Sequence, residues 1–89
     1  MNEELLRLFL DVVQLGSFQK VAKKNYVSQR AVSRQIQRLE QNLHTQLFER
    51  KKNKIILTPA GEFFRKRSEA IINMLDATQH ELHRFSYRG

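Results

Sequence analysis

Cysteine is absent from the 89-residue chain, while glycine occurs three times and proline once. Without cysteine, a disulfide scaffold, a cysteine-based zinc site and a thiol nucleophile are all excluded. The three glycines are too scattered to form a phosphate-binding loop. No window holds the roughly 18 consecutive apolar residues of a membrane-spanning helix, and the N-terminus lacks the basic start and apolar run of a signal peptide. We therefore expect a cytoplasmic protein with no membrane partner.

Catalytic and metal-binding motifs are also missing. The spacing of His80 and His83 differs from the His-Glu-x-x-His of a zinc protease, and serine and aspartate occur without a nucleophile motif. A length of 89 residues allows one small domain, and 40% hydrophobic with 28% charged residues is an ordinary globular mix. We predict a small globular domain that is not an enzyme and that has no catalytic residues, no metal and no cofactor.

Positive charge is unevenly distributed along the chain. The formal net charge is +7, from 16 basic and 9 acidic residues. Residues 17–67 contain 13 of the basic residues and only 3 of the acidic ones, so the two ends together are acidic. A basic middle with acidic flanks predicts one face that binds a polyanion. A solubilising surface is the alternative interpretation of the same charges.

Apolar periodicity predicts three helices followed by a hairpin. Residues 3–14, 18–24 and 28–43 have helical apolar spacing. The first of these helices is apolar on two faces, so it needs a partner besides its own core, either a later helix or a second chain. Two helices joined by a short turn, the second with an exposed polar and basic face, match the helix-turn-helix pattern. Two β-prone runs around a basic tip in residues 46–57 predict a hairpin, or wing.

A long helix is predicted over residues 59–86, with Thr58 as its N-cap and Pro59 at its first position. A heptad-like apolar seam along this helix indicates a second chain packed against it, and so a dimer. The seam residues are Phe64, Ile71, Leu75, Thr78, Leu82 and Phe85. The neighbouring stripe, expected to face the chain's own domain, consists of Phe63, Ala70, Met74 and Ala77. A helix folded back over its own domain is the alternative to the dimer.

With these features in order, the chain resembles the DNA-binding domain of LysR-type transcriptional regulators over essentially all of its length. The resemblance rests on Gly16-Ser17-Phe18, Val27-Ser28-Gln29-x-Ala31-Val32-Ser33-x-Gln35-Ile36, Leu47-Phe48-Glu49-Arg50 and Leu57-Thr58-Pro59-Ala60-Gly61. It implies a mainly α fold, a winged helix-turn-helix of three helices and a two-stranded wing, followed by a long linker helix. Residues 1–58 are then the DNA-binding domain, with the helix-turn-helix at about 18–37 and the wing at about 46–57, and residues 59–89 form the linker and dimerisation helix.

The resemblance also concerns parts that this sequence does not contain. The family usually has a C-terminal effector-binding domain, so we expect the chain to be a truncated piece of a longer bacterial regulator. A small-molecule effector is expected only for that other domain. The resemblance further implies a homodimer through the linker helix, and it allows a tetramer of full-length subunits and contact with RNA polymerase.

Besides Asn53 in the wing, three residues in and after the helix-turn-helix depart from the family pattern. Asn25 stands where a buried leucine is usual, so either the turn is loosened or the burial shifts onto Tyr26. His44 replaces the glycine that commonly closes the recognition helix, so that end needs another cap. Arg30 replaces a frequent proline and adds a charged, flexible side chain at the start of the recognition helix.

A recognition helix places its N-terminal residues against base edges in the major groove. Arginine can hold guanine through two acceptors, and glutamine can pair with adenine. The predicted base-reading residues are Gln29, Arg30, Ser33 and Arg34. Because more than half of such bonds go to the DNA backbone, a phosphate contact alone is the alternative for each of them.

Backbone contacts are expected from the helix N-termini and from the basic wing. The predicted set is Ser17, Lys20, Ser28, Gln37, Arg38, Arg50, Lys51, Lys52 and Lys54, with Ser17 and Ser28 also as N-caps. Asn53 stands in the wing where arginine is frequent, so Lys52 or Lys54 is expected to take over its reach toward the minor groove. The roles of Phe63, Phe64, Arg65 and Arg67 stay open between packing and phosphate contact.

Sequence-specific binding of double-stranded DNA by a dimeric transcriptional regulator is therefore the predicted function. A dimeric protein-interaction module that uses the long helix, such as an anti-regulator, is the alternative. An RNA-binding domain is disfavoured because the exposed faces lack stacking aromatics, with only Tyr26 and Tyr87 expected to be exposed. A lipid-surface helix is disfavoured because residues 59–86 mix acids with bases.

Overall fold

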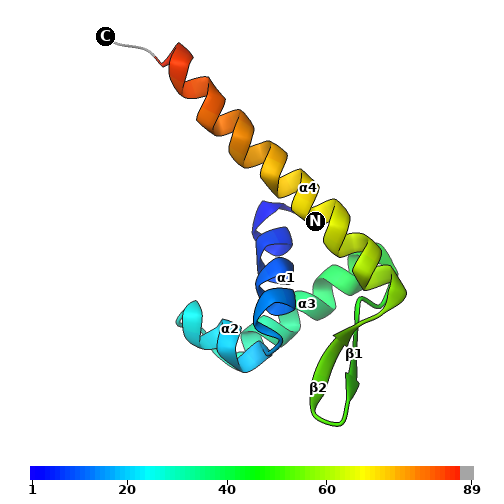
Figure 1. Ribbon diagram of the computed structural model, residues 1–89. Coiled ribbons are helices and arrows are strands. Elements are labelled where there is room, and N and C mark those ends of the chain that lie inside the picture. The colour runs from blue at the N-terminus through cyan, green and yellow to red at the C-terminus, as the bar shows by residue number, and fades with distance from the viewer. Residues whose placement is uncertain (87–89) are drawn as a thin grey trace.

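Helices dominate the structure, a computed structural model that describes residues 1–86. The elements are α1 (Glu3–Leu15), α2 (Phe18–Lys24), α3 (Gln29–Leu43), β1 (Phe48–Lys51), β2 (Lys54–Leu57), α4 (Pro59–Leu82) and the short 3-10 turn η1 (His83–Phe85) (Figure 1). This order confirms the predicted mainly α fold with a two-stranded wing and a long C-terminal helix. Residues 87–89, the end of the predicted linker segment, lie outside the described residues, and Tyr87 is among them.

A side-chain oxygen caps the start of each α-helix. Asn2, Ser17, Ser28 and Thr58 each accept a hydrogen bond, of 2.9 to 3.2 Å, from the backbone N–H three residues further on. These bonds satisfy N–H groups that have no acceptor within the helix, and they confirm the three caps predicted from the sequence. At the end of α3, His44 itself adopts the left-handed conformation (φ 52°) that glycine usually provides.

The core lies where α1 meets the helix-turn-helix and the base of the wing. The fully buried ring of Phe9 on α1 has its centroid 5.3 Å from that of Phe48 and 4.9 Å from that of Phe64. Phe48 begins β1 and Phe64 belongs to the first turns of α4. The other fully buried apolar side chains are Val12, Val21, Val32, Ile36, Leu39 and Leu47. The Phe9 ring thus contacts both the base of the wing and the start of α4.

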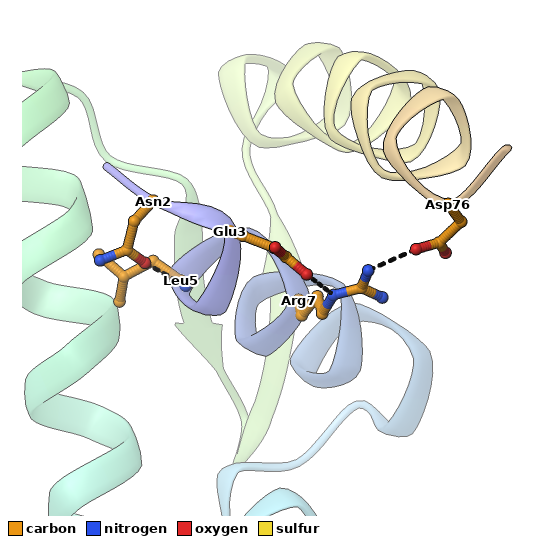
Figure 2. Close-up of polar contacts among 5 residues, drawn as sticks. All are labelled: Asn2, Glu3, Leu5, Arg7 and Asp76. Carbon is orange, nitrogen blue, oxygen red and sulfur yellow. Dashed lines mark hydrogen bonds and ion pairs between the residues drawn. The ribbon is translucent and has the colours of Figure 1, made fainter. Parts of the chain in front are cut away.

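The second apolar face of α1 packs against α4 of the same chain, which is one of the two partners expected for it. Arg7 adds a polar tie, because its guanidinium donates to the Glu3 carboxylate at 2.8 Å and to the Asp76 carboxylate of α4 at 2.6 Å (Figure 2). These two carboxylates, Asp76 above all, hold the pKa of Arg7 above its ordinary value. α1 therefore joins the helix-turn-helix to α4 as far along that helix as Asp76.

α4 turns a different face to the domain from the one predicted. The predicted stripe consists of Phe63, Ala70, Met74 and Ala77. That prediction is wrong, because Phe63 is 60% exposed and Met74 is 69% exposed. The domain is covered instead by Phe64, Ser68 and Ile72, which are spaced four residues apart and so share one side of the helix. Phe64, which we placed in the dimer seam, therefore belongs to the chain's own core.

Beyond Asp76, which pairs with Arg7, α4 leaves the domain. Its C-terminal half projects away from the other helices (Figure 1). Leu75 is half-buried there, whereas Ile71, Leu82 and Phe85 are exposed. A helix folded back over its own domain thus describes α4 only as far as Asp76. In the part of the chain that the structure describes, every helix is too short or too polar to cross a membrane.

The turn between α2 and α3 is closed by backbone hydrogen bonds. The N–H of Asn25 donates to the carbonyl of Val21 at 3.0 Å, and the N–H of Val27 donates to that of Ala22 at 3.0 Å. Tyr26 adopts the left-handed conformation (φ 56°) and is 96% exposed. The predicted shift of burial onto Tyr26 is therefore wrong, because the backbone at this residue turns its ring outward, while its predicted exposure is confirmed.

Candidate nucleic-acid interface

α3 buries one side and presents a polar, basic side to solvent. Val32, Ile36 and Leu39 face the core. The exposed residues of its other side include Gln29, Arg30, Arg34, Gln37 and Arg38. Ser33 is half-buried, so it is the least accessible of the four residues predicted to read bases.

The wing is a two-stranded antiparallel hairpin whose tip is rich in lysine. Lys51 pairs with Lys54, and the two residues between them, Lys52 and Asn53, form the turn. Both turn residues have positive φ, 50° and 65°, as a tight hairpin turn of this kind requires. The tip therefore presents three exposed lysines within four residues.

Two adjoining grooves, called here the wing-side grooves, bring α3 together with the wing and the start of α2. The predicted DNA-contacting residues that line the first, of about 300 Å³, are Ser17, Gln29, Arg50, Lys52 and Lys54. Those that line the second, of about 270 Å³, are Ser33, Gln37 and Arg50. Residues far apart in the sequence thus share one continuous surface.

Arg50 lies where the two wing-side grooves meet. Its guanidinium carbon is 5.2 Å from the centroid of the Phe18 ring, which is a cation–π contact. Phe18 is itself buried, with its ring centroid 6.3 Å from that of Phe48. A contact with the ring face leaves the N–H donors of the guanidinium available for another acceptor. The arginine is therefore oriented by the core while its donors remain available to a ligand.

The arginines of α3 lie on a different line of the helix from the residues in the wing-side grooves. They are Arg30, Arg34 and Arg38, spaced four residues apart. Arg38 lines a third groove, between α1 and α3, together with Asn2 and Glu4. The structure thus gathers most of the predicted DNA-contacting residues next to the wing but places Arg38 beside α1.

Some of the basic residues in the 17–67 segment are paired within the molecule. The Lys24 ammonium lies 3.1 Å from the Asp11 carboxylate. Arg65 donates to the carboxylates of Glu62 and Glu69 on the same helix. These two carboxylates, Glu62 first, raise the pKa of Arg65 above its ordinary value. Their charges contribute less to an anion-binding face than the sequence total suggests.

The other residues at the start of α4 are engaged in packing. Phe64 packs into the core against Phe9, and the Arg67 guanidinium lies 4.8 Å from the centroid of the exposed Phe63 ring. Together with the ion pairs of Arg65, these contacts favour packing over phosphate contact as the role of the residues at the start of α4.

Sequence reasoning missed the role of Glu40. Its carboxylate accepts hydrogen bonds from the backbone N–H groups of Leu47, at 2.7 Å, and Phe48, at 3.2 Å, where the chain enters β1. A signal was present, because this acid in a basic segment has no lysine or arginine three or four residues away to pair with. That absence does not identify the backbone N–H groups, since water can satisfy a carboxylate equally well.

The sequence matches one protein family and several of its members. The model of the family described as "Bacterial regulatory helix-turn-helix protein, lysR family" matches residues 4–62. A probable RuBisCO transcriptional regulator of Cyanidioschyzon merolae is 48% identical over 73 residues, which are 82% of this chain and 24% of that protein. A probable nitrogen assimilation transcriptional activator of Synechocystis is 44% identical over 82 residues, 92% of this chain and 26% of that protein. The chain thus spans about a quarter of these relatives, which are transcription regulators and not enzymes.

Solved structures of DNA complexes have the same fold. The DNA-binding domain of BenM bound to catB site 1 DNA is 35% identical and has a TM-score of 0.91, with 100% of this chain and 99% of that chain covered. The DNA-binding domain of CbnR in complex with DNA is 30% identical and has a TM-score of 0.88, with 98% and 100% covered. The similarity extends over α4 as well as the winged helix-turn-helix.

Proposed function

Because the chain belongs to the LysR family of bacterial regulatory helix-turn-helix proteins, we propose that it binds specific sequences in double-stranded DNA as part of a transcription regulator. The observation that carries the proposal is the exposed polar face of α3, which shares the wing-side grooves with the lysine-rich wing. Two of the similar structures are domains bound to DNA. A concave, basic surface beside a protruding helix suits a duplex, because the helix fits the major groove and the basic rim reaches phosphates.

Base reading is assigned to the first two turns of α3. Gln29, Arg30 and Arg34 are exposed and carry the donor and acceptor patterns that distinguish adenine and guanine in the major groove. Ser33 is half-buried and short, so it reaches only a base edge that comes close to the helix. Gln29 and Ser33 lie on the wing side of α3, and the two arginines lie on the next line of the helix.

Phosphate contacts are assigned to residues around this reading face. They come from the N-terminal ends of α2 and α3, from the flank of α3 and from the wing. The residues are Ser17, Lys20, Ser28, Gln37, Arg38, Arg50, Lys51, Lys52 and Lys54. Asn53 stands where the family frequently has arginine, so the contact with the minor groove is assigned to Lys52, its neighbour in the turn of the wing. Arg38 contacts a separate stretch of backbone, because it lies on the α1 side of α3.

A homodimer through α4 completes the proposal. The exposed members of the predicted seam are Ile71, Thr78, Leu82 and Phe85, with Leu75 half-buried beside them. Phe63 and Met74, which are also exposed, extend this apolar face, and Phe64 is withdrawn from it. Two copies joined in this way would present two reading helices to two half-sites of one duplex.

Effector binding, tetramer assembly and contact with RNA polymerase are proposed only for the whole regulator, since the chain matches only about a quarter of the length of its relatives. The exposed face of α4 also suits a protein-interaction module, so the experiment must separate the two functions.

Selection of duplexes from a random-sequence library by the purified chain tests the proposal. We expect enrichment of a two-fold related motif, and binding that weakens at least tenfold between about 50 and 200 mM salt, because phosphate contacts release counterions. No enrichment, together with salt-independent binding, would favour a protein-interaction module instead.

A further inference from the structure

The segment that leads into the wing, residues 46–48, is held from two directions. From α3, the Glu40 carboxylate accepts the N–H groups of Leu47 and Phe48 at 2.7 and 3.2 Å. From the start of α4, the Thr58 hydroxyl donates to the Gln46 carbonyl at 2.7 Å, and the Thr58 N–H donates to the Leu47 carbonyl at 3.0 Å. Three consecutive residues at the base of the wing are therefore fixed relative to two helices.

The rest of the wing is held mainly by side-chain packing. It consists of two strands of four residues each, and an isolated two-stranded hairpin is marginal on its own. Leu47 and Phe48 are buried at the base of the wing, Ile55 and Leu57 pack against the core, and Arg50 lies against the Phe18 ring, but this side-chain packing leaves the backbone at the strand entry to be fixed by hydrogen bonds. The two bonds to Glu40 fix the peptide planes on either side of the buried Leu47, and so they fix the direction in which the hairpin leaves α3.

Glu40 stands in an electrostatically unfavourable place for any role in contacting DNA directly. It lines the second wing-side groove with Ser33, Gln37 and Arg50, where a phosphate would repel a carboxylate. Bonds from backbone N–H groups to a carboxylate are charge-assisted and stronger than neutral ones. The presence of an acid at this position is thus explained by its hydrogen bonds to the backbone N–H groups of Leu47 and Phe48.

Building on the DNA binding proposed above, we propose that Glu40 is a positioning residue for that binding. Its carboxylate sets the direction of the wing relative to the reading face of α3, and so sets whether the tip lysines reach the duplex while α3 occupies the major groove. The residue acts through Lys52 and Lys54 without touching DNA.

The test measures how the 89-residue chain binds the duplex that it selects from a random library, across a series of salt concentrations. Glu40→Ala removes both bonds. Glu40→Asp keeps the charge but shortens the side chain by one methylene, so the carboxylate no longer reaches both N–H groups, and the conservative change keeps the helix folded. Glu49→Gln, at a half-buried position on β1, is the control for the negative charge that Glu40→Ala removes near the wing. Circular dichroism and stoichiometric titration restrict the comparison to folded, active protein.

Both Glu40 variants are expected to weaken binding and to reduce the slope of log K against log salt by about one to two units, since each lysine that no longer reaches a phosphate removes about one unit. A double-mutant cycle gives the decisive measurement. In a Lys52→Ala/Lys54→Ala background, Glu40→Asp should change affinity by less than about twofold, because the lysines that it positions are already gone. Glu49→Gln should bind as tightly as the parent or more tightly.

Two results would overturn the proposal. Unchanged or tighter binding by Glu40→Asp would mean that the wing keeps its direction without these bonds. An equal loss of affinity in the parent and in the Lys52→Ala/Lys54→Ala background would mean that Glu40 does not act through these two lysines. Failure of DNA binding altogether is a separate outcome, because the unaltered chain would then select no duplex from the library.

Discussion

Gly61 and Leu47 approach so closely that a Cβ atom on Gly61 would lie 2.1 Å from the Leu47 carbonyl oxygen. The first turn of α4 thus rests directly on the backbone that leads into the wing. Only glycine permits this contact, and the reason is space, since the φ of Gly61 lies outside the left-handed region.

Gly61→Ala is therefore expected to lower the free energy of unfolding by about 2 kcal/mol or more, because a methyl group forced against a main-chain atom displaces α4 or the wing. Denaturant unfolding followed by circular dichroism measures the change. Gly16→Ala is the contrasting control, since Gly16 has φ 66° with nothing within 4 Å of an added Cβ. Gly16→Ala should therefore lower the free energy of unfolding only by the cost of a left-handed backbone at alanine, roughly 1–2 kcal/mol. A Gly61→Ala protein as stable as the parent would contradict the close approach.

The helices and their caps could be predicted from the sequence because both depend on local patterns. Ser17, Ser28 and Thr58 lie directly before helical periodicity, and the structure confirms all three as caps. The wing was predictable for the same reason, since a basic tip separates two β-prone runs.

The face of α4 could not be predicted, because several apolar stripes on one helix are equivalent until their neighbours are known. Phe64 and Phe63 are adjacent in the sequence and equally apolar, and only the position of Phe9 decides that Phe64 is the buried one. The role of Glu40 could not be predicted for a related reason. Its partners are backbone N–H groups seven and eight residues away, which carry no sequence signal of their own.

Arg34→Ala tests the assignment of base reading to α3. Removing a bidentate hydrogen bond to guanine is expected to weaken binding to the selected duplex by about 1–3 kcal/mol and to relax selectivity at one base pair in each half-site. Lys52→Ala is the comparison, because a wing lysine that binds phosphate contributes about equally to the affinity for every sequence. Affinities for a set of singly substituted duplexes give both quantities. The same preference for every base pair in parent and variant would show that Arg34 contacts only phosphate.

Leu82→Asp tests dimerisation through α4. Leu82 is 56% exposed in the single chain, so the charge leaves the fold intact but is buried twice in a two-fold interface, at a cost of about 2 kcal/mol or more. Sedimentation equilibrium should show monomers at concentrations where the parent is dimeric. Asn73→Asp adds the same charge to an exposed position on the opposite side of α4 and should leave the dimer unchanged. If Leu82→Asp sediments as the parent does, the interface lies elsewhere.

Acid should weaken the start of α4 through Glu62. The Arg65 guanidinium, by hydrogen bonding to the Glu62 carboxylate, holds the pKa of this glutamate below its ordinary value of 4.5. A carboxylate with a lowered pKa contributes stability that is present above pH 4.5 and is lost as the pH falls through the folded-state pKa. The thermal midpoint of the parent should therefore drop further between pH 6 and pH 3 than that of Glu62→Gln. Equal drops in the two proteins would show that the Arg65 pair contributes nothing measurable.

Ser68 is the polar residue that the core accommodates least well. It is fully buried on the face of α4 that covers the domain, and its hydroxyl has no hydrogen-bond partner among the described residues. A buried hydroxyl without a partner loses its hydration without compensation, and alanine is also the better helix former. Ser68→Ala is thus expected to raise the free energy of unfolding by about 1 kcal/mol, which for a chain of this size raises the thermal midpoint by roughly 4–8 °C.

Asn73→Ala separates the two causes, because this exposed position of the same helix gains the propensity of alanine without removing a buried hydroxyl. The increase for Ser68→Ala should exceed that for Asn73→Ala when both are measured by scanning calorimetry at equal protein concentration. A decrease in the stability of Ser68→Ala would mean that the hydroxyl does bond in solution. Its acceptor would then be an internal water or a carbonyl of α4, and the contact between α1 and α4 would be more polar than its apolar lining indicates.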